Sequence, residues 1–240
     1  DIIFLWVARM VMAGYEWEQK RPFDHVYFTG MVRDKQRRKM SKSLGNSPDA
    51  LKLIEDFGAD GVRFGMLLSS PAGGDLLFDE KLVEQGRNFC NKIWNALRLV
   101  DGWETDENVT ISEGEMLAYQ WMVNKMNALA TDIDKNFKEY RLSEALMSIY
   151  SFVWSDFCSW YLEMVKPNFG QKISTKSKEN TIQIFSEICS LMHPFMPFVT
   201  EEIWHQLKNG NQGADCIIST YPKPASYDQV LIDRVEQAKD

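Results

Sequence analysis

The sequence predicts a mainly α-helical chain in two parts, a short α/β segment over residues 1–78 and a helical bundle over residues 79–240. Two observations predict this division. An apolar stretch at 2–13 is followed by a β-branched and aromatic run at 25–32, which is the order of a helix and a strand in an α/β sheet. Beyond residue 78, long amphipathic segments take over, and such helices bury their apolar faces against one another in a bundle.

In the first part, the almost wholly apolar run 2–13 predicts a buried helix, and the Gly-bounded run 25–32 predicts a buried strand. Ser47 stands before a proline, which is typical of an N-cap followed by the first turn of a helix. We therefore expect a helix that ends near residue 57, and a second helix at 60–68.

Five long segments predict the helices of the bundle, at 79–101, 113–137, 141–166, 176–192 and 197–208. The first of them shows the helical period most plainly, because its apolar residues recur at steps of three, four and seven: Val83, Cys90, Ile93, Leu97 and Val100. A short strand at 217–220 and a modest helix at 227–239 complete the prediction.

Composition excludes several classes of protein. The formal net charge of −7 argues against a general polyanion binder, so contact with nucleic acid must come from a local patch. The chain has no run of about 18 apolar residues, so we expect no membrane span. Four cysteines without a CxxC pair and three scattered histidines predict reduced thiols, a cytoplasmic location and no metal site.

A local basic patch is found at 33–42, where six cationic side chains stand against one acid. Lys39 and Lys42 bracket a Met-Ser pair, with hydroxyls at Ser41 and Ser43 and a flexible Gly45 nearby. Ammonium and hydroxyl groups on such a loop can bind a triphosphate, and the following helix N-terminus adds partial positive charge. The alternative is an ordinary solvated run of charges.

The five residues 39–43 read KMSKS, which is identical to the signature of class I aminoacyl-tRNA synthetases. The flanking segments resemble the valyl-tRNA synthetase family most, and the resemblance covers essentially the whole chain. The segments that carry it lie at 1–10, 25–30, 39–47, 58–63, 77–79, 86–89 and 193–204. The last of these is shared with isoleucyl and leucyl synthetases, which remain the alternative families.

The resemblance implies that residues 1–78 are the C-terminal part of a Rossmann-type α/β nucleotide-binding domain, with the KMSKS loop and a segment that contacts the tRNA stem. Residues 79–240 would then be an α-helical anticodon-binding domain. The implied reaction joins valine and ATP into valyl-adenylate and pyrophosphate, and then moves the valyl group to tRNA(Val). The implied partners are valine, tRNA(Val) and ATP with its Mg²⁺, and we expect a monomer.

The resemblance also assigns residues. The ATP-binding set would be Lys39, Met40, Ser41, Lys42 and Ser43. Lys39 and Lys42 would be catalytic, because their charges would stabilise the leaving pyrophosphate.

The amino-acid pocket would include Asp1, Ile2 and Trp6, a carboxylate for the ammonium group and two apolar walls for the isopropyl group. Asp1 is equally well explained as the N-cap of the first helix.

The helix at 79–101 carries a polar stripe on which we expect contacts to unpaired bases. The candidate tRNA-binding residues are Arg87, Asn88, Asn91, Asn95 and Arg98. The alternative is a solvated helix face. Trp94 and Trp103 can stack on bases, but their neighbours favour a place in the core.

The first ATP signature of this family, of the His-Ile-Gly-His type, is absent from the 240 residues, as is an editing domain. We therefore expect the chain by itself not to activate valine. A non-catalytic tRNA-binding helical module is the second reading. A P-loop hydrolase is excluded, because no GxxxxGK[ST] segment occurs.

Overall fold

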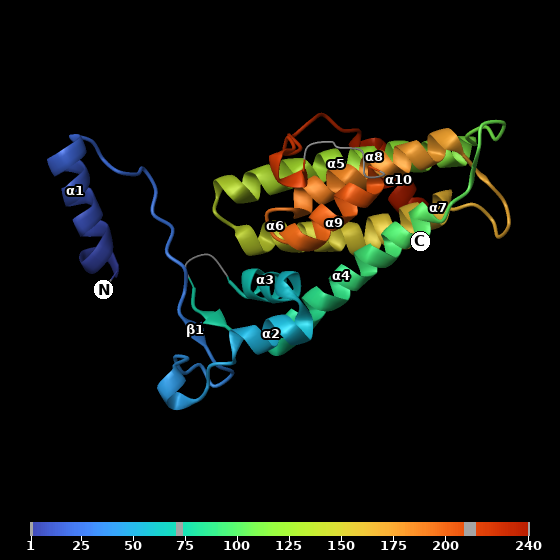
Figure 1. The fold of residues 1–240 in the computed structure, drawn as a ribbon. Helices are drawn as coiled ribbons and strands as arrows, with labels where there is room; N and C mark the ends of the chain where they lie inside the picture. Colours follow the sequence, from blue (N-terminus) through green and yellow to red (C-terminus); the bar gives the residue numbers. More distant parts are fainter. Residues whose placement is uncertain (1, 71–73, 209–214, 240) are drawn as a thin grey trace.

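The computed structural model describes residues 2–70, 74–208 and 215–239, and it is mostly helical (Figure 1). A π-helical stretch, Ile3–Val7, runs into the first α-helix. The elements that follow in the first part of the chain are α1 (Ala8–Glu18), β1 (Val32–Arg33), a 3₁₀ turn (Lys42–Leu44), α2 (Ala50–Phe57), α3 (Ala59–Leu68) and β2 (Leu76–Leu77).

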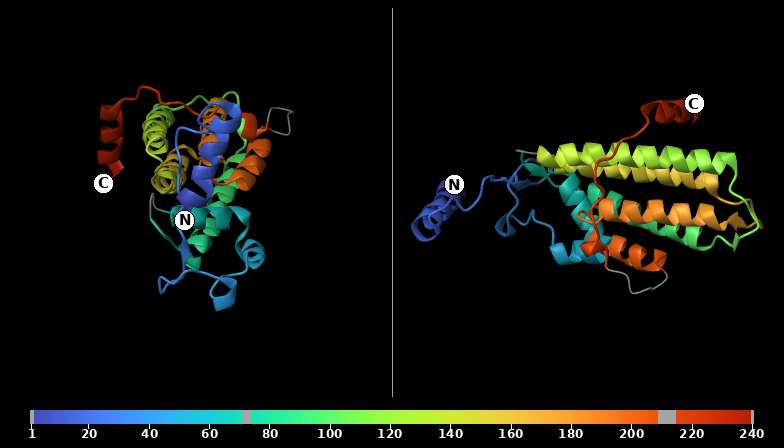
Figure 2. Two further views of the ribbon diagram at one scale, coloured as in Figure 1. Left: turned by 90° about the vertical axis from the view of Figure 1, so that its left-hand side faces the viewer. Right: turned by 90° about the horizontal axis from the view of Figure 1, so that it is seen from above.

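The five helices predicted for the bundle are confirmed. They appear as α4 (Glu80–Asp101), α5 (Glu113–Lys138), a long rod made of α6 (Leu142–Ser151), a π-helical stretch (Phe152–Tyr161) and α7 (Leu162–Val165), then α8 (Thr175–Met192) and α9 (Pro197–Leu207). The expected C-terminal helix is α10 (Gln229–Lys239). Figure 2 shows the long helices lying side by side along the bundle. Two short strands, β3 (Thr105–Asp106) and β4 (Ile173–Ser174), pair in parallel at one end of it.

The predicted strand at 217–220 is wrong. Cys216–Ile218 forms a 3₁₀ turn instead. The Glu201 carboxylate accepts hydrogen bonds from the backbone N–H groups of Cys216, at 2.7 Å, and Ile217, at 3.3 Å. These backbone N–H groups thus find their acceptor on a side chain of α9. In a strand they would need a neighbouring strand as their acceptor.

The hydrophobic core lies between the bundle helices and extends onto α3. Phe64 of α3 is fully buried, with its ring centroid 5.6 Å from those of Phe89 and Tyr150. Trp121 and Phe157, from the middle of the bundle, are also fully buried. Because α3 packs into this core, it is joined to the bundle across the boundary expected near residue 78, and the division into two domains stays a prediction.

Three glycines let α3 and α4 approach closely. A Cβ on Gly86 of α4 would stand 2.6 Å from the carbonyl oxygen of Gly61 and 2.8 Å from Cβ of Phe64. A Cβ on Gly65 would stand 2.7 Å from the backbone nitrogen of Val83. The backbones of the two helices therefore meet at a distance that only glycine permits.

Polar contacts also tie α3 to the start of α9. The buried Asp60 carboxylate accepts a hydrogen bond from the Val199 N–H at 2.6 Å, so it caps the N-terminus of α9. Burial raises the pKa of Asp60, and the bonds from α9 partly offset that cost. The Arg63 guanidinium donates to the carbonyl oxygens of Phe195 at 3.0 Å and Pro194 at 2.9 Å.

The N-terminal helix forms, but its predicted burial is wrong. No residue of Ile3–Val7 or of α1 is buried, and Phe4 and Trp17 are 78% and 79% exposed. Figure 1 shows α1 standing away from the rest of the molecule, at the end of an extended connection. An apolar run predicts a helix whose side chains are covered by another element. No described element other than the adjoining Ile3–Val7 stretch packs on α1.

The predicted strand at 25–32 is also largely wrong, because only its last residue lies in a strand. β1 pairs in parallel with β2, joining Val32 to Leu76 and Arg33 to Leu77. A strand needs a neighbour to bond its backbone, and β1 finds one in β2 and in the single antiparallel bridge between Arg33 and Lys39, whereas residues 25–30 lie in no strand. The described residues therefore show a mostly helical chain, without the sheet of a Rossmann-type fold.

The helix predicted to start at Ser47 begins later. Its N-cap is Asp49, whose carboxylate accepts from the Leu51 N–H at 2.9 Å. It ends at Phe57 as expected, and the helix at 60–68 is confirmed as α3. Among the described residues no helix has the length and apolarity that crossing a membrane requires. All four cysteines are free thiols, as expected.

The packing of α3 on α4 yields the first testable prediction. The substitution Gly86→Ala should lower the free energy of unfolding by about 1–3 kcal/mol, because the added methyl group overpacks the contact with Gly61. The matched control is Gly114→Ala, in the exposed first turn of α5, where a Cβ meets nothing closer than 4.0 Å. Alanine favours helices, so the control should be neutral or stabilising. Urea unfolding measures the free energy of unfolding of both variants. Equal values for the two variants would contradict the packing argument.

Candidate functional site

The KMSKS residues follow a small hairpin at the end of β1. The Asp34 N–H donates to the Arg38 carbonyl at 2.9 Å, and the Met40 N–H donates to the Val32 carbonyl at 3.1 Å. Arg37, at the tip, adopts a left-handed conformation with φ of 62°. This hairpin delivers Lys39 to the molecular surface directly beside β1.

The motif itself forms a tight turn. The Ser41 side chain accepts from the Leu44 N–H at 3.3 Å and lies 3.1 Å from the Ser43 hydroxyl. Gly45 ends the turn with φ of 65°, which glycine adopts without strain. Ser41 therefore shapes the loop, and Met40 is half-buried beside it.

The charges of the loop are distributed unevenly. Three of its cations form ion pairs in the structure: Arg33 with Asp75, Lys35 with Asp79 at 3.3 Å, and Arg38 with Asp34 at 2.7 Å. In the described part of the chain, Lys39 and Lys42 are exposed and have no ion-pair partner. The uncompensated positive charge thus includes the two lysines that the sequence predicts to be catalytic, and a phosphate group is the kind of ligand that it attracts.

The single acid of the loop, Asp34, is its most highly bonded side chain. The carboxylate accepts from Asn46 Nδ2 at 2.9 Å, from Arg38 Nε at 2.8 Å and from the Gln36 N–H at 3.0 Å. The hydrogen bond from Asn46 and those from Arg38 lower the pKa of Asp34 to about 2, so it stays ionised at neutral pH. In the sequence, Asp34 is only the one acid among six cations of the basic patch. Its role as the hydrogen-bond acceptor that organises the loop was not evident from the sequence alone.

The cavities do not mark the motif. One cavity, of about 680 Å³, lies along α1 and is lined by residues between Arg9 and Gln19, the C-cap of that helix. A shallow cavity of about 350 Å³ borders the loop, with Asp34, Met40 and Asn46 among its lining residues. Lys39 and Lys42 are not among its lining residues, and both are exposed.

The predicted amino-acid pocket is not assembled in the described residues. Asp1 lies outside them. Ile2 and Trp6 are both 57% exposed, and the guanidinium of Arg9 lies 4.9 Å from the Trp6 ring centroid. Figure 1 shows their helix well away from the loop at residues 42–44. Their roles stay predictions.

The predicted tRNA-binding residues lie on α4. Four of them are exposed, and their side chains make no hydrogen bond within the described chain: Asn88, Asn91, Asn95 and Arg98. Arg87 differs, because it is half-buried with its guanidinium 5.5 Å from the Phe57 ring centroid and 3.8 Å from Glu84. Arg87 thus packs α4 against α2, whereas the other four offer free donors and acceptors to solvent.

The expectation that the two tryptophans belong to the core is confirmed. Trp103 is 6% exposed, and Trp94 packs half-buried against the core. The Lys178 ammonium group donates to the carbonyl oxygens of Asp101 and Trp103 at 3.0 and 2.7 Å. It therefore holds the end of α4 to α8.

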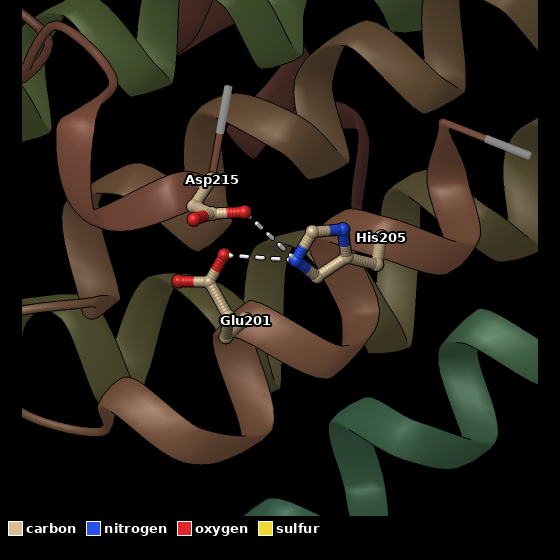
Figure 3. A group of neighbouring side chains, drawn as sticks. All are labelled: Glu201, His205 and Asp215. Atoms are coloured by element: carbon tan, nitrogen blue, oxygen red, sulfur yellow. Dashed lines mark ion pairs between the residues drawn. The ribbon is translucent and has the colours of Figure 1, made fainter. Parts of the chain in front are cut away.

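Three potential metal-ligating side chains meet beside α9 (Figure 3). His205 Nε2 lies 3.2 Å from Glu201 Oε1 and 3.3 Å from Asp215 Oδ1. Glu201 also holds the 3₁₀ turn of Cys216–Ile218 through its backbone N–H groups. These contacts give the cluster a structural explanation, as a staple between α9 and the turn that follows it.

Comparison with known proteins agrees with the sequence resemblance. Residues 119–240 match the family described as the anticodon-binding domain of tRNA ligase, and residues 1–79 match tRNA synthetases class I (I, L, M and V). A valine–tRNA ligase of Porphyromonas gingivalis is 52% identical over 240 residues, which is all of this chain and 27% of the relative. One of Bacteroides fragilis is 54% identical over 241 residues, covering 100% of this chain and 28% of the relative.

A more distant valine–tRNA ligase, from Bacillus cereus, is 41% identical over 229 residues, 92% of this chain and 26% of the relative. The chain thus spans about a quarter of the length of the curated relatives it matches. Among solved structures, LeuRS of Agrobacterium radiobacter, in a ternary complex with tRNA and LeuAMS, superposes with a TM-score of 0.65. Its sequence identity is 17%, over 93% of this chain and 27% of that chain, so the likeness shows a shared fold.

One family match covers about half of the chain, a second covers its first 79 residues, and the relatives align along its length. The chain therefore belongs to the class I tRNA synthetases that carry the anticodon-binding domain of tRNA ligases, and it is similar throughout to the valine–tRNA ligases of that family.

Proposed function

We propose that the protein to which this chain belongs activates valine with ATP and transfers the valyl group to tRNA(Val). The observation that carries the proposal is the KMSKS turn, with Lys39 and Lys42 exposed and without ion pairs, in a chain that resembles valine–tRNA ligases along its whole length. In the first step a valine carboxylate oxygen bonds to the α-phosphorus of ATP and pyrophosphate leaves. In the second step a terminal ribose hydroxyl of the tRNA attacks the acyl carbonyl and AMP leaves.

Lys39 and Lys42 act on the first step. Negative charge accumulates on the pyrophosphate as its bond to the α-phosphorus breaks, and two ammonium groups beside it lower the energy of that state. The Ser43 hydroxyl can add a hydrogen bond to phosphate, while Ser41 and Met40 keep the turn in shape. The donors of this loop suit phosphate oxygens and not a cation, so Mg²⁺ enters bound to ATP.

The exposed side chains of α4 act on tRNA. Asn88, Asn91 and Asn95 offer amides that can bond the edges of unpaired bases, and Arg98 can bond phosphate or stack on a base. A chain with a net charge of −7 favours recognition by a few such contacts and not by a broad basic surface. Arg87 packs on Phe57, so it supports the exposed face of α4 and does not contact the tRNA bases directly.

The remaining parts of the proposal follow from the family. Asp1, Ile2 and Trp6 form part of the valine pocket. The other walls of that pocket must come from residues beyond the described ones. Residues 1–78 complete a Rossmann-type nucleotide-binding domain, and residues 79–240 bind the anticodon. The protein acts as a monomer in the cytoplasm. Isoleucyl or leucyl specificity is the competing assignment, and substrate panels distinguish it.

The role of the motif lysines is tested by the substitution Lys42→Ala in the full-length protein. Removal of one preorganised charge should slow valine-dependent exchange between ATP and labelled pyrophosphate by about 10²–10³-fold. Lys52→Ala is the matched control, because Lys52 is also exposed and without an ion pair in the described chain, but lies on α2. Exchange that is unchanged in Lys42→Ala, or that responds to isoleucine or leucine in place of valine, would contradict the proposal.

The role of α4 is tested by a variant with both Asn91→Ala and Asn95→Ala. The loss of two hydrogen bonds, each worth about 1 kcal/mol, should raise the Kd for a tRNA(Val) transcript about 10–30-fold. The penalty should shrink for a transcript with an altered anticodon. Gln120→Ala, an exposed amide on α5, serves as the control. Fluorescence anisotropy at about 0.15 M salt gives the Kd values, since phosphate contacts depend on salt. Equal penalties on both transcripts would exclude anticodon reading by these residues.

A further inference from the structure

We propose that Asp34 and Asn46 form one positioning unit, the Asp34–Asn46 latch, which holds the KMSKS turn in the shape that presents Lys39 and Lys42 to ATP. This inference rests on the proposed function of the loop. Both side chains are less exposed than the lysines, since Asp34 is 7% exposed and Asn46 is half-buried, and both are bonded to groups of the loop itself. Both therefore act through the backbone of the motif and not by contact with substrate.

The Asn46 amide reaches three points of the loop at once. Its Nδ2 donates to Asp34 Oδ2 at 2.9 Å and to the Lys39 carbonyl oxygen at 3.3 Å. Its Oδ1 accepts from the Ser41 N–H at 3.0 Å. The backbone groups that it binds lie on either side of Met40. One amide therefore sets the direction of the chain both where Lys39 leaves it and where the turn that carries Lys42 begins.

Asp34 anchors that amide to the hairpin. Besides Asn46, its carboxylate accepts from the Gln36 N–H at 3.0 Å, the Arg38 N–H at 2.9 Å and the Arg38 guanidinium at 2.7–2.8 Å. The hairpin tip, the motif and the residue after Gly45 are thus tied to one buried charge. Because the pKa of Asp34 is lowered to about 2, this charge persists near neutral pH.

The latch matters because the lysines have no other tether. In the described chain neither Lys39 nor Lys42 takes part in an ion pair or a side-chain hydrogen bond. Their placement therefore depends on the backbone from which they project. A catalytic charge must be held close to its productive position, and displacement by about 1 Å can cost about 10²-fold in rate. Arg38 neutralises Asp34, so the latch adds order to the loop without weakening the field of the lysines.

The test uses Asn46→Ala and Asp34→Ala in the full-length protein. Each should lower kcat for valine-dependent exchange of ATP and pyrophosphate by about 10–100-fold, with a smaller effect on the KM for valine. Transfer of the valyl group to tRNA from supplied valyl-adenylate should stay within twofold of wild type, because that step releases no pyrophosphate. The double variant should be no slower than the slower single variant, because both substitutions open the same latch.

The chain offers a matched control at Asp106 and Asn108. This pair forms a similar local contact, with the half-buried Asp106 accepting through Oδ1 from the N–H and from Nδ2 of the exposed Asn108, both at 2.9 Å. The pair lies at the end of β3 and in the turn that follows it, between α4 and α5, and its side-chain hydrogen bonds stay within that turn. Asn108→Ala should keep full exchange and transfer activity.

Each outcome separates the latch from the proposed function. If Lys42→Ala loses exchange while Asn46→Ala and Asp34→Ala keep it, the latch is wrong and the function of the loop stands. If Lys42→Ala also keeps exchange, the proposed function fails first. Equal loss of exchange and of transfer, or a Tm lowered well below that of Asn108→Ala, would show general damage to the fold and would likewise overturn the positioning role.

Discussion

The close contact between α3 and α4 joins the loop-bearing part of the chain to the helical bundle. Gly61 on α3 faces Gly86 on α4, and Gly65 faces the backbone of Val83, so the absence of side chains at these glycines lets the two backbones approach closely. Around this contact, Phe64 enters the core of the bundle and Asp60 caps α9. The helix α3, which lies within the class I synthetase match, thus shares a core with helices of the bundle, and this core joins the two parts of the chain.

Charge is organised locally in this acidic chain. Along the hairpin each of three cations has an acidic partner, whereas the lysines of the motif have none in the described residues. On α4 the exposed amides between Asn88 and Asn95 are likewise left without protein partners. Satisfied groups hold the structure, and unsatisfied exposed groups remain for ligands. The pattern explains how a chain with a net charge of −7 can still expose unpaired positive charge at the loop for which we propose phosphate binding.

Prediction from the sequence succeeded for elements with a local, repeated pattern of residues. It failed for elements whose structure depends on another element packed or paired against them. The period of α4 predicted its bounds to within a residue, and α5 begins at Glu113 as predicted, after the capping box of Ser112 and Glu115. The apolar run at 2–13 predicted a helix but not its exposure. The run at 25–32 has strand composition, yet its backbone lacks partners over most of its length. For the site, the KMSKS motif predicted the two lysines, whose roles stay predictions, while the bonds that shape their loop did not show in the sequence.

The sequence by itself determined the family, the helical segments and the motif, because these depend on residue types at fixed spacing along the chain. Only the tertiary structure decided which charges are paired, that Arg87 packs on Phe57 while Asn91 stays exposed, and that Asp34 meets Asn46. The physical reason is that hydrogen bonds and ion pairs act over a few ångströms in space. Twelve residues separate Asp34 from Asn46 along the chain, and it is the fold that brings their side chains to 2.9 Å.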